Sequence, residues 1–265
     1  MSDEMSVVET PLDLAPHTPL RVRLIAAFCR LIVRGYTRLT IERAFNLPDG
    51  PAILAFNHLS WFDPFVVLAA HPHEPRLYLF GPRELRMDAG VRNKVIRWTK
   101  IAVPFRPDRR DLVAAVRKVE SIAAAGGHLA IAGEGRISVG ERRVEPLSGG
   151  IATFARRSGA PVVPMAINGT SWFAFRWTVR VRYGAPLTIA EGERDADFLE
   201  RVRQAFLLLV ADWPDREPPR FPFGRFMSEL FNDWPGGTGR PAQIPADDGR
   251  PVAYTPVAPA EGENQ

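Results

Sequence analysis

Between residues 51 and 190, the sequence alternates short apolar runs with longer stretches of helical periodicity. The runs with the length and composition of strands are PAILAF (51–56), RLYLF (76–80), KIAVPF (100–105), HLAIAG (128–133), PVVPMAI (161–167) and TVRVRYG (178–184). Helices are expected to begin near Pro64, Asp111 and Ser148, and a last helix to span about 195–212. Nearly continuous apolar runs separated by helices are typical of a sheet that is buried on both faces. The sequence therefore predicts an α/β fold, a single domain with a mostly buried mixed sheet flanked by helices.

The segments on either side of this domain differ from it in composition. Residues 1–20 are polar or interrupted by proline, and residues 214–265 hold ten of the 25 prolines of the chain. We expect a disordered N-terminus over 1–20, a folded domain over 46–212 and a largely flexible tail over 213–265. A chain of 265 residues with 46% hydrophobic content can bury one sizeable core.

An amphipathic helix is predicted to precede the domain, within residues 21–45. On a period of 3.6 residues, one stripe consists of Arg23, Arg30, Arg34 and Arg38, and a broad apolar face consists of Leu24, Ile25, Phe28, Leu31 and Ile32. Such a helix either lies in an anionic membrane interface or packs on its own domain with the arginines in solvent. The chain has no run of about 18 apolar residues that would span a bilayer, and MSDEMSVVET does not resemble a signal peptide.

The charge of the chain favours an anionic partner. The formal net charge is +4 and the isoelectric point is about 9.6, and almost all basic residues are arginines, whose guanidinium groups match phosphate. A genome rich in G and C is an alternative cause of this arginine content. Nucleic acid is not the predicted partner, because no signature of a nucleic-acid-binding motif accompanies the charge. The single cysteine, Cys29, excludes an intramolecular disulfide and suits a reducing compartment, so we expect a cytoplasmic protein.

The stretch FNHLSWFD (56–63) places a histidine and an aspartate five positions apart, directly after a predicted strand. Asp63 precedes Pro64, and proline is favoured at the first position of a helix, so one interpretation is that Asp63 caps a helix. The other interpretation is that the carboxylate folds back onto one nitrogen of the His58 imidazole. The second nitrogen would then remove a proton from a hydroxyl group.

Four short motifs in order carry a resemblance to a known family. They are Asn57-His58 with Asp63 (NHxxxxD), Arg106 at the end of IAVPFR, residues 133–138 (GEGRIS), and Pro164 within PVVPMAI. Together they resemble the glycerolipid acyltransferases of the lysophosphatidic acid acyltransferase type, and they cover roughly residues 50–170. The resemblance implies an enzyme that moves an acyl chain from acyl-CoA or acyl carrier protein to 1-acylglycerol 3-phosphate, which gives phosphatidic acid.

The third motif departs from the usual family pattern of Pro-Glu-Gly-Thr-Arg-Ser. Gly133 replaces the proline, and Arg136 follows Gly135 directly, without the intervening threonine. A Glu-Gly-Arg-Ile/Leu version is similar to the acyltransferase domains of bacterial lysophospholipid acyl-transfer enzymes. The resemblance therefore implies acyl transfer but leaves open the headgroup of the acceptor, with a lyso-ornithine lipid and lysophosphatidylethanolamine as alternatives.

The resemblance also implies roles for individual residues. His58 and Asp63 form the catalytic pair, and Arg106 and Arg136 grip the phosphate of the acceptor from adjacent strand-end loops. Glu134 holds the glycerol hydroxyls or positions Arg136, and Asn57 and Gly135 also belong to the substrate site. The acyl donor is a substrate, and no further cofactor and no metal are expected. The expected partners are a lysophospholipid, acyl-CoA or acyl carrier protein, and the inner face of the cell membrane.

Other functions are less consistent with the sequence. A serine esterase would need a GxSxG turn, which is absent, whereas a non-catalytic lipid-binding protein would not require His58 and Asp63 together. His71 and His73, beside Glu74, are expected in a surface loop and not in a metal site. Cys29 is expected to pack and not to act as a nucleophile. Trp61 and Phe62 line an acyl channel in one interpretation and belong to the core in the other.

Overall fold

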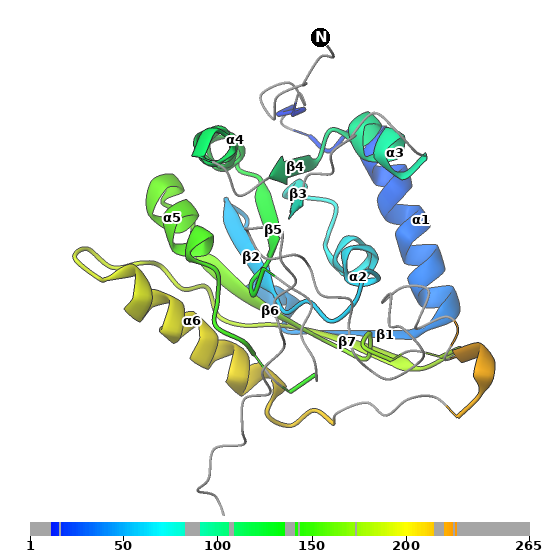
Figure 1. Cartoon of the computed structure of the whole chain (residues 1–265). Helices are drawn as coiled ribbons and strands as arrows, with labels where there is room; N and C mark the ends of the chain where they lie inside the picture. Colours follow the sequence, from blue (N-terminus) through cyan, green and yellow to red (C-terminus); the bar gives the residue numbers. More distant parts are fainter. Residues whose placement is uncertain are drawn as a thin grey trace, which may run out of the picture.

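The protein, represented by a computed structural model, is built around one sheet with the strand order β1-β7-β6-β2-β5-β3-β4 (Figure 1). The structure describes residues 12–15, 17–82, 91–105, 109–135, 141–142, 144–172, 174–214, 220–224 and 226. The strands are β1 (Arg38–Glu42), β2 (Ala52–Phe56), β3 (Leu77–Pro82), β4 (Ala102–Phe105), β5 (His128–Ala132), β6 (Val162–Asn168) and β7 (Thr178–Tyr183). Neighbouring strands are parallel except β6 and β7, which pair antiparallel. The mixed α/β sheet and all of the strands predicted from apolar runs are confirmed.

Helices cover both faces of the sheet (Figure 1). They are α1 (Leu20–Tyr36), α2 (Asp63–Ala70), α3 (Val91–Thr99), α4 (Arg109–Ala124), α5 (Gly149–Ser158) and α6 (Asp195–Val210), with a short 3₁₀ helix η2 (Ala44–Asn46). Strand β2 is buried on both faces: Leu54 packs in the cluster that contains Val66 of α2, and Ile53 packs in the cluster that contains Phe206 of α6. Because neither face meets water, β2 reads as a continuous apolar run and not as an alternating one.

The N-terminal helix is shorter than predicted. It ends at Tyr36, where both the backbone N–H and the hydroxyl of Thr37 donate to Val33 O, at 2.8 and 2.6 Å. Residues 38–42 then form β1, which pairs parallel with β7 at the edge of the sheet. The predicted helical segment 21–45 is therefore wrong beyond Tyr36, because the ladder to β7 provides backbone hydrogen bonds that the local sequence does not reveal.

The expected disorder of residues 1–20 is wrong for the described residues 12–15 and 17–19. Asp13 forms an ion pair with Arg76 at 3.1 Å and another with Arg21, and its carbonyl accepts a hydrogen bond from the Tyr78 hydroxyl at 2.7 Å. Thr18 donates to His73 O at 2.7 Å. These contacts hold the segment against the start of β3. Residues 1–11 and most of the proline-rich segment after 214 lie outside the described residues.

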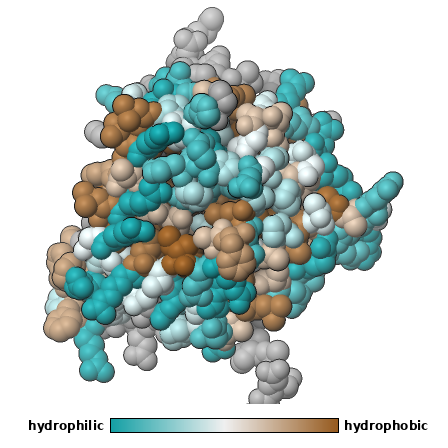
Figure 2. Space-filling model, turned by 180° about the vertical axis from the view of Figure 1, so that it is seen from behind, coloured by the Kyte–Doolittle hydropathy of each residue, from teal (hydrophilic) through white to brown (hydrophobic). Residues whose placement is uncertain are grey.

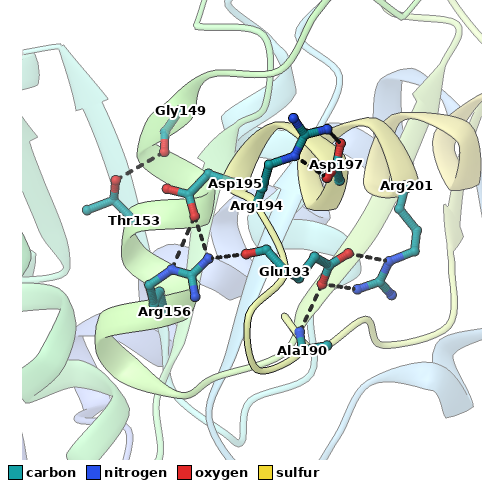
Figure 3. A network of polar contacts seen from close by, with 9 residues as sticks. All are labelled: Gly149, Thr153, Arg156, Ala190, Glu193, Arg194, Asp195, Asp197 and Arg201. Atoms are coloured by element: carbon teal, nitrogen blue, oxygen red, sulfur yellow. Dashed lines mark hydrogen bonds and ion pairs between the residues drawn. The ribbon is translucent and has the colours of Figure 1, made fainter.

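Helix α6 is joined to α5 by a polar network at the surface (Figure 3). Arg156 of α5 donates to the Asp195 carboxylate at 2.6 Å and to Glu193 O at 2.7 Å, while the Glu193 carboxylate accepts from Arg201 at 2.8 Å. Because these groups are mostly exposed, each pair contributes little to stability. The helix is held mainly by its buried face, which consists of Phe198, Val202, Phe206, Leu209 and Val210.

Candidate active site

The candidate site lies at the carboxyl end of β2, between the loops that follow β5 and β6. Both of those strands pair with β2 in parallel, so all three end at the same edge of the sheet. The Asn57 side chain accepts from Ile167 N at 2.6 Å and donates to Ile167 O at 2.9 Å. On the other side, Gly133 N donates to Phe56 O at 2.7 Å. These contacts hold the start of the FNHLSWFD loop in place, with Phe56 hydrogen-bonded to Gly133, directly after β5, and Asn57 hydrogen-bonded to β6.

Asp63 folds back onto His58 as the second interpretation of the motif predicts. His58 Nδ1 lies 2.8 Å from Asp63 Oδ2, and the same oxygen accepts from Leu59 N at 2.6 Å and from Ser60 N at 2.8 Å. Asp63 is fully buried, and its position in α2 is the first residue of the helix, after the N-cap Phe62. The structure describes no side-chain cap for this helix, so the capping interpretation is wrong.

The contacts of His58 define which nitrogen is able to act as a base. Since Nδ1 faces a carboxylate oxygen that already accepts two backbone N–H groups, Nδ1 carries the proton and Nε2 carries the lone pair. The His58 side chain is 8% exposed, and the ring centroids of Phe56 and Trp61 each lie 5.9 Å from that of the imidazole in edge-on contact. The site therefore holds the imidazole in an orientation in which Nε2 can accept a proton from a bound hydroxyl.

The predicted substrate residues differ in how far the structure describes them. Glu134 is buried, and its carboxylate accepts from Glu145 N at 3.1 Å. Gly135 is exposed with a φ of +66°, a backbone conformation that favours glycine. Arg106 and Arg136 lie outside the described residues.

The strands that lead to the two arginines are not neighbours. Strand β3 separates β4, which precedes Arg106, from β5, which precedes Arg136, so the expectation of adjacent strand-end loops is wrong. Two strand spacings amount to about 10 Å, a separation that a pair of long arginine side chains can span. A shared phosphate thus remains compatible with this topology.

The sequence interpretation missed a polar cluster beside the pair. The hydroxyl of Thr170 donates to Asp63 Oδ1 at 2.5 Å, and the buried carboxylate of Glu141 accepts from Gly169 N at 2.8 Å and from the side chains of Asn168 and Ser171. A signal was present, because the polar run 168–171 directly follows a predicted strand. Loops in that position build the sites of parallel sheets.

Three further expectations have clear outcomes. His71 does not lie in a surface loop: it is buried, and its Nε2 lies 2.8 Å from His128 Nδ1. Burial lowers the pKa of His71 to about 3, with His128 as the second cause, and no group of three or more metal-binding side chains occurs within the described ranges. Cys29 is buried as expected, and burial raises the pKa of its thiol to about 11. Phe62 belongs to the core beneath α2, whereas Trp61 is half-buried beside His58.

Comparison with known families supports a class of protein. Residues 38–168 match the family model described as Acyltransferase, which supports an acyltransferase family for this chain. The matched segment runs from the first residue of β1 to the last residue of β6, and it contains His58, Asp63 and Glu134. Comparison with curated proteins gives no match.

A solved structure supports the fold assignment. The chain is similar to the crystal structure of the 1-acyl-sn-glycerophosphate (LPA) acyltransferase, PlsC, from Thermotoga maritima, with a TM-score of 0.57 and 22% sequence identity. The similarity covers 74% of this chain and 81% of that chain. The α/β sheet and its helical layers are therefore those of a known acyltransferase fold.

Proposed function

We propose that the protein transfers an acyl chain from acyl-CoA or acyl carrier protein to the free hydroxyl of 1-acylglycerol 3-phosphate, forming phosphatidic acid in phospholipid biosynthesis. The observation that carries the proposal is the His58–Asp63 pair, with a contact of 2.8 Å and the second imidazole nitrogen left to act as a base. The match of residues 38–168 to the acyltransferase family model supports this reaction type.

The chemistry needs one base and no covalent acyl-enzyme. His58 Nε2 takes the proton of the acceptor hydroxyl while the hydroxyl oxygen forms a bond to the thioester carbonyl carbon. Asp63 stabilises the resulting imidazolium through Nδ1. The tetrahedral intermediate then collapses with cleavage of the C–S bond, and the imidazolium returns its proton to the leaving thiolate. The products are the new ester and the free thiol, and the enzyme regains its starting state.

The acceptor phosphate is assigned to Arg106 and Arg136, which follow strands that end at this edge of the sheet. Guanidinium groups can hold a phosphate by two parallel charge-assisted hydrogen bonds. Glu134 supports the loop that carries Arg136, because its carboxylate already accepts a hydrogen bond from Glu145 N. Gly135 supports the same loop through its positive φ. Asn57 has a supporting role too, since both polar atoms of its side chain contact Ile167.

Membrane association is proposed through α1, on the inner face of the cell membrane. The helix buries Val22, Ala26, Cys29 and Val33 against its own domain, while the opposite stripe of Leu20, Leu24, Phe28 and Leu31 is exposed. Figure 2, a view from behind, has apolar side chains along its left edge, the side that α1 and α3 occupy after the rotation. Among the described helices, none is long and apolar enough to cross a bilayer. An exposed apolar stripe flanked by arginines suits the interface of an anionic membrane.

The arginine stripe of α1 is divided between two tasks. Arg30 donates to Ala69 O at 3.1 Å and to His71 O at 2.6 Å, and these contacts hold the C-terminal end of α2. Arg23 pairs with Glu74 at 3.5 Å. Arg34 of α1 and Arg38, which the structure places at the start of β1 and not in the helix, are exposed, and we assign the contact with lipid headgroups to them.

The proposal is tested with purified protein and a panel of lysolipids, each offered with acyl-CoA and with acyl carrier protein, with products read by mass spectrometry. We expect 1-acylglycerol 3-phosphate to be the best acceptor and His58→Ala to lower the rate by about 10²–10⁴-fold, because a neutral hydroxyl is a poor nucleophile without a base. Better transfer to a lyso-ornithine lipid or to lysophosphatidylethanolamine would reassign the acceptor. Lipid binding without transfer would indicate a non-catalytic lipid-binding protein.

A further inference from the structure

The carboxylate of Asp63 is held at both of its oxygens by different parts of the chain. Oδ2 faces the local loop, where it meets His58 Nδ1 and accepts from the backbone of Leu59 and Ser60. Oδ1, within the described part of the chain, accepts from Thr170 Oγ1 at 2.5 Å. Thr170 is fully buried and lies 107 positions from Asp63 in sequence. The orientation of the carboxylate thus depends on a distant residue as well as on its own loop.

The end of β6 and the loop after it hold the FNHLSWFD loop at two points. Ile167 exchanges two hydrogen bonds with the Asn57 side chain, one residue before His58. Thr170 reaches Asp63, the residue that orients His58. In the sequence, His58 therefore lies between Asn57 and Asp63, whose side chains contact β6 and the loop after it. A shift of that loop would rotate the Asp63 carboxylate relative to the imidazole ring.

The loop after β6 is itself anchored by a buried carboxylate. Glu141 is fully buried, and its Oε2 accepts from Gly169 N at 2.8 Å and from the Asn168 side chain, while its Oε1 accepts from Ser171. These donors flank Thr170 on both sides. A buried carboxylate with several donors in fixed directions restricts the backbone between them.

From this arrangement we propose that Thr170 is a positioning residue for the general base and that Glu141 supports it through the loop 168–171. The Thr170 hydroxyl prevents the Asp63 carboxylate from rotating, so that Oδ2 stays in line with His58 Nδ1 and the lone pair of Nε2 stays directed at the acceptor hydroxyl. The effect on turnover rests on the proposed function, whereas the effect on the imidazole does not. Thr170 itself need not contact the substrate.

The first experiment compares Thr170→Val, Thr170→Ser and a matched control, Thr37→Val. Thr37 is also buried and also donates one hydroxyl hydrogen bond, to Val33 O at 2.6 Å, but it lies at the end of α1 and away from Asp63. We expect Thr170→Val to lower kcat about tenfold with little change in KM for either substrate, because one charge-assisted hydrogen bond is lost. Thr170→Ser should retain most of the activity, and Thr37→Val should lower the melting temperature without lowering kcat.

The outcomes separate positioning from stability. Full kcat in Thr170→Val, or an equal loss of kcat in Thr37→Val, would overturn the proposal. If Glu141 acts through Thr170, Glu141→Gln should lower kcat, and the double variant Glu141→Gln/Thr170→Val should be no slower than the slower single variant. Strictly additive losses would contradict the link between the two residues.

A second measurement needs no substrate. In protein with ¹⁵N-labelled histidine, NMR reports which nitrogen of His58 carries the proton. We expect a single Nδ1–H tautomer in the wild type and a mixture in Thr170→Val. An unchanged tautomer in the variant would overturn the proposal even if the enzyme is active. If the wild type transfers no acyl group to any lysolipid, the proposed function fails, but the NMR comparison still decides the role of Thr170.

Discussion

The apolar stripe of α1 provides the most quantitative test of membrane association. Leu24, Phe28 and Leu31 are 56%, 55% and 72% exposed in a helix whose other face is already buried. Full burial of one such side chain contributes about 1.5–3 kcal/mol, so moving the exposed half of each into lipid contributes about 1 kcal/mol. The triple change Leu24→Gln, Phe28→Gln and Leu31→Gln therefore removes about 3 kcal/mol of binding, or about 100-fold in the partition coefficient.

The assay is co-sedimentation with liposomes that contain anionic lipid, over a series of lipid concentrations. A matched control replaces the exposed apolar residues Leu112, Val113 and Leu208 of α4 and α6 with glutamine. We expect the α1 variant to remain in the supernatant with an unchanged melting temperature, because surface substitutions change stability by only about 0.5 kcal/mol. Equal binding by the α1 variant and the wild type would refute the reasoning, as would an equal loss in the control.

Three further predictions concern the site and the core. Asp63→Asn should lower kcat by about 10²–10⁴-fold in the acyl-transfer assay, since the imidazolium loses its charged partner; near-normal turnover would exclude an orienting role. Arg136→Ala should raise KM about tenfold or more for the phosphate-bearing acceptor and little for the acyl donor, and its effect should not add to that of Arg106→Ala if both bind one phosphate. Equal changes in both KM values together with a lower melting temperature would assign Arg136 to the structure of the loop. Cys29 should resist alkylation at pH 8 in the folded protein and react after denaturation, because burial raises its pKa to about 11 and keeps the thiol protonated. The same shift should lower stability as the pH rises from 9 to 11, because the unfolded chain loses this proton first.

Most of the sheet was predictable because its central strands have a strong local signal. Strands β2, β5 and β6 are buried on both faces, so their sequences are nearly continuous apolar runs bounded by polar or glycine residues. The edge strand β1 has no such signal: RLTIE is partly exposed and continues an arginine-rich helical pattern. Its strand conformation depends on the ladder with β7, which is 140 residues away at the pair Arg38↔Thr178.

The candidate site likewise has a part that the local sequence indicates and a part that only the tertiary structure reveals. The sequence by itself kept His58 and Asp63 close, because only four residues separate them, but it left open whether Asp63 caps a helix or contacts the imidazole. It could not indicate that Thr170 donates to that carboxylate or that Asn57 binds Ile167, since these partners are more than 100 positions apart. Only the parallel alignment of β2 beside β6 brings them together, and a buried carboxylate without those donors would be costly. The local sequence thus brought the candidate base and its carboxylate close together, and the tertiary structure decided what holds them in place.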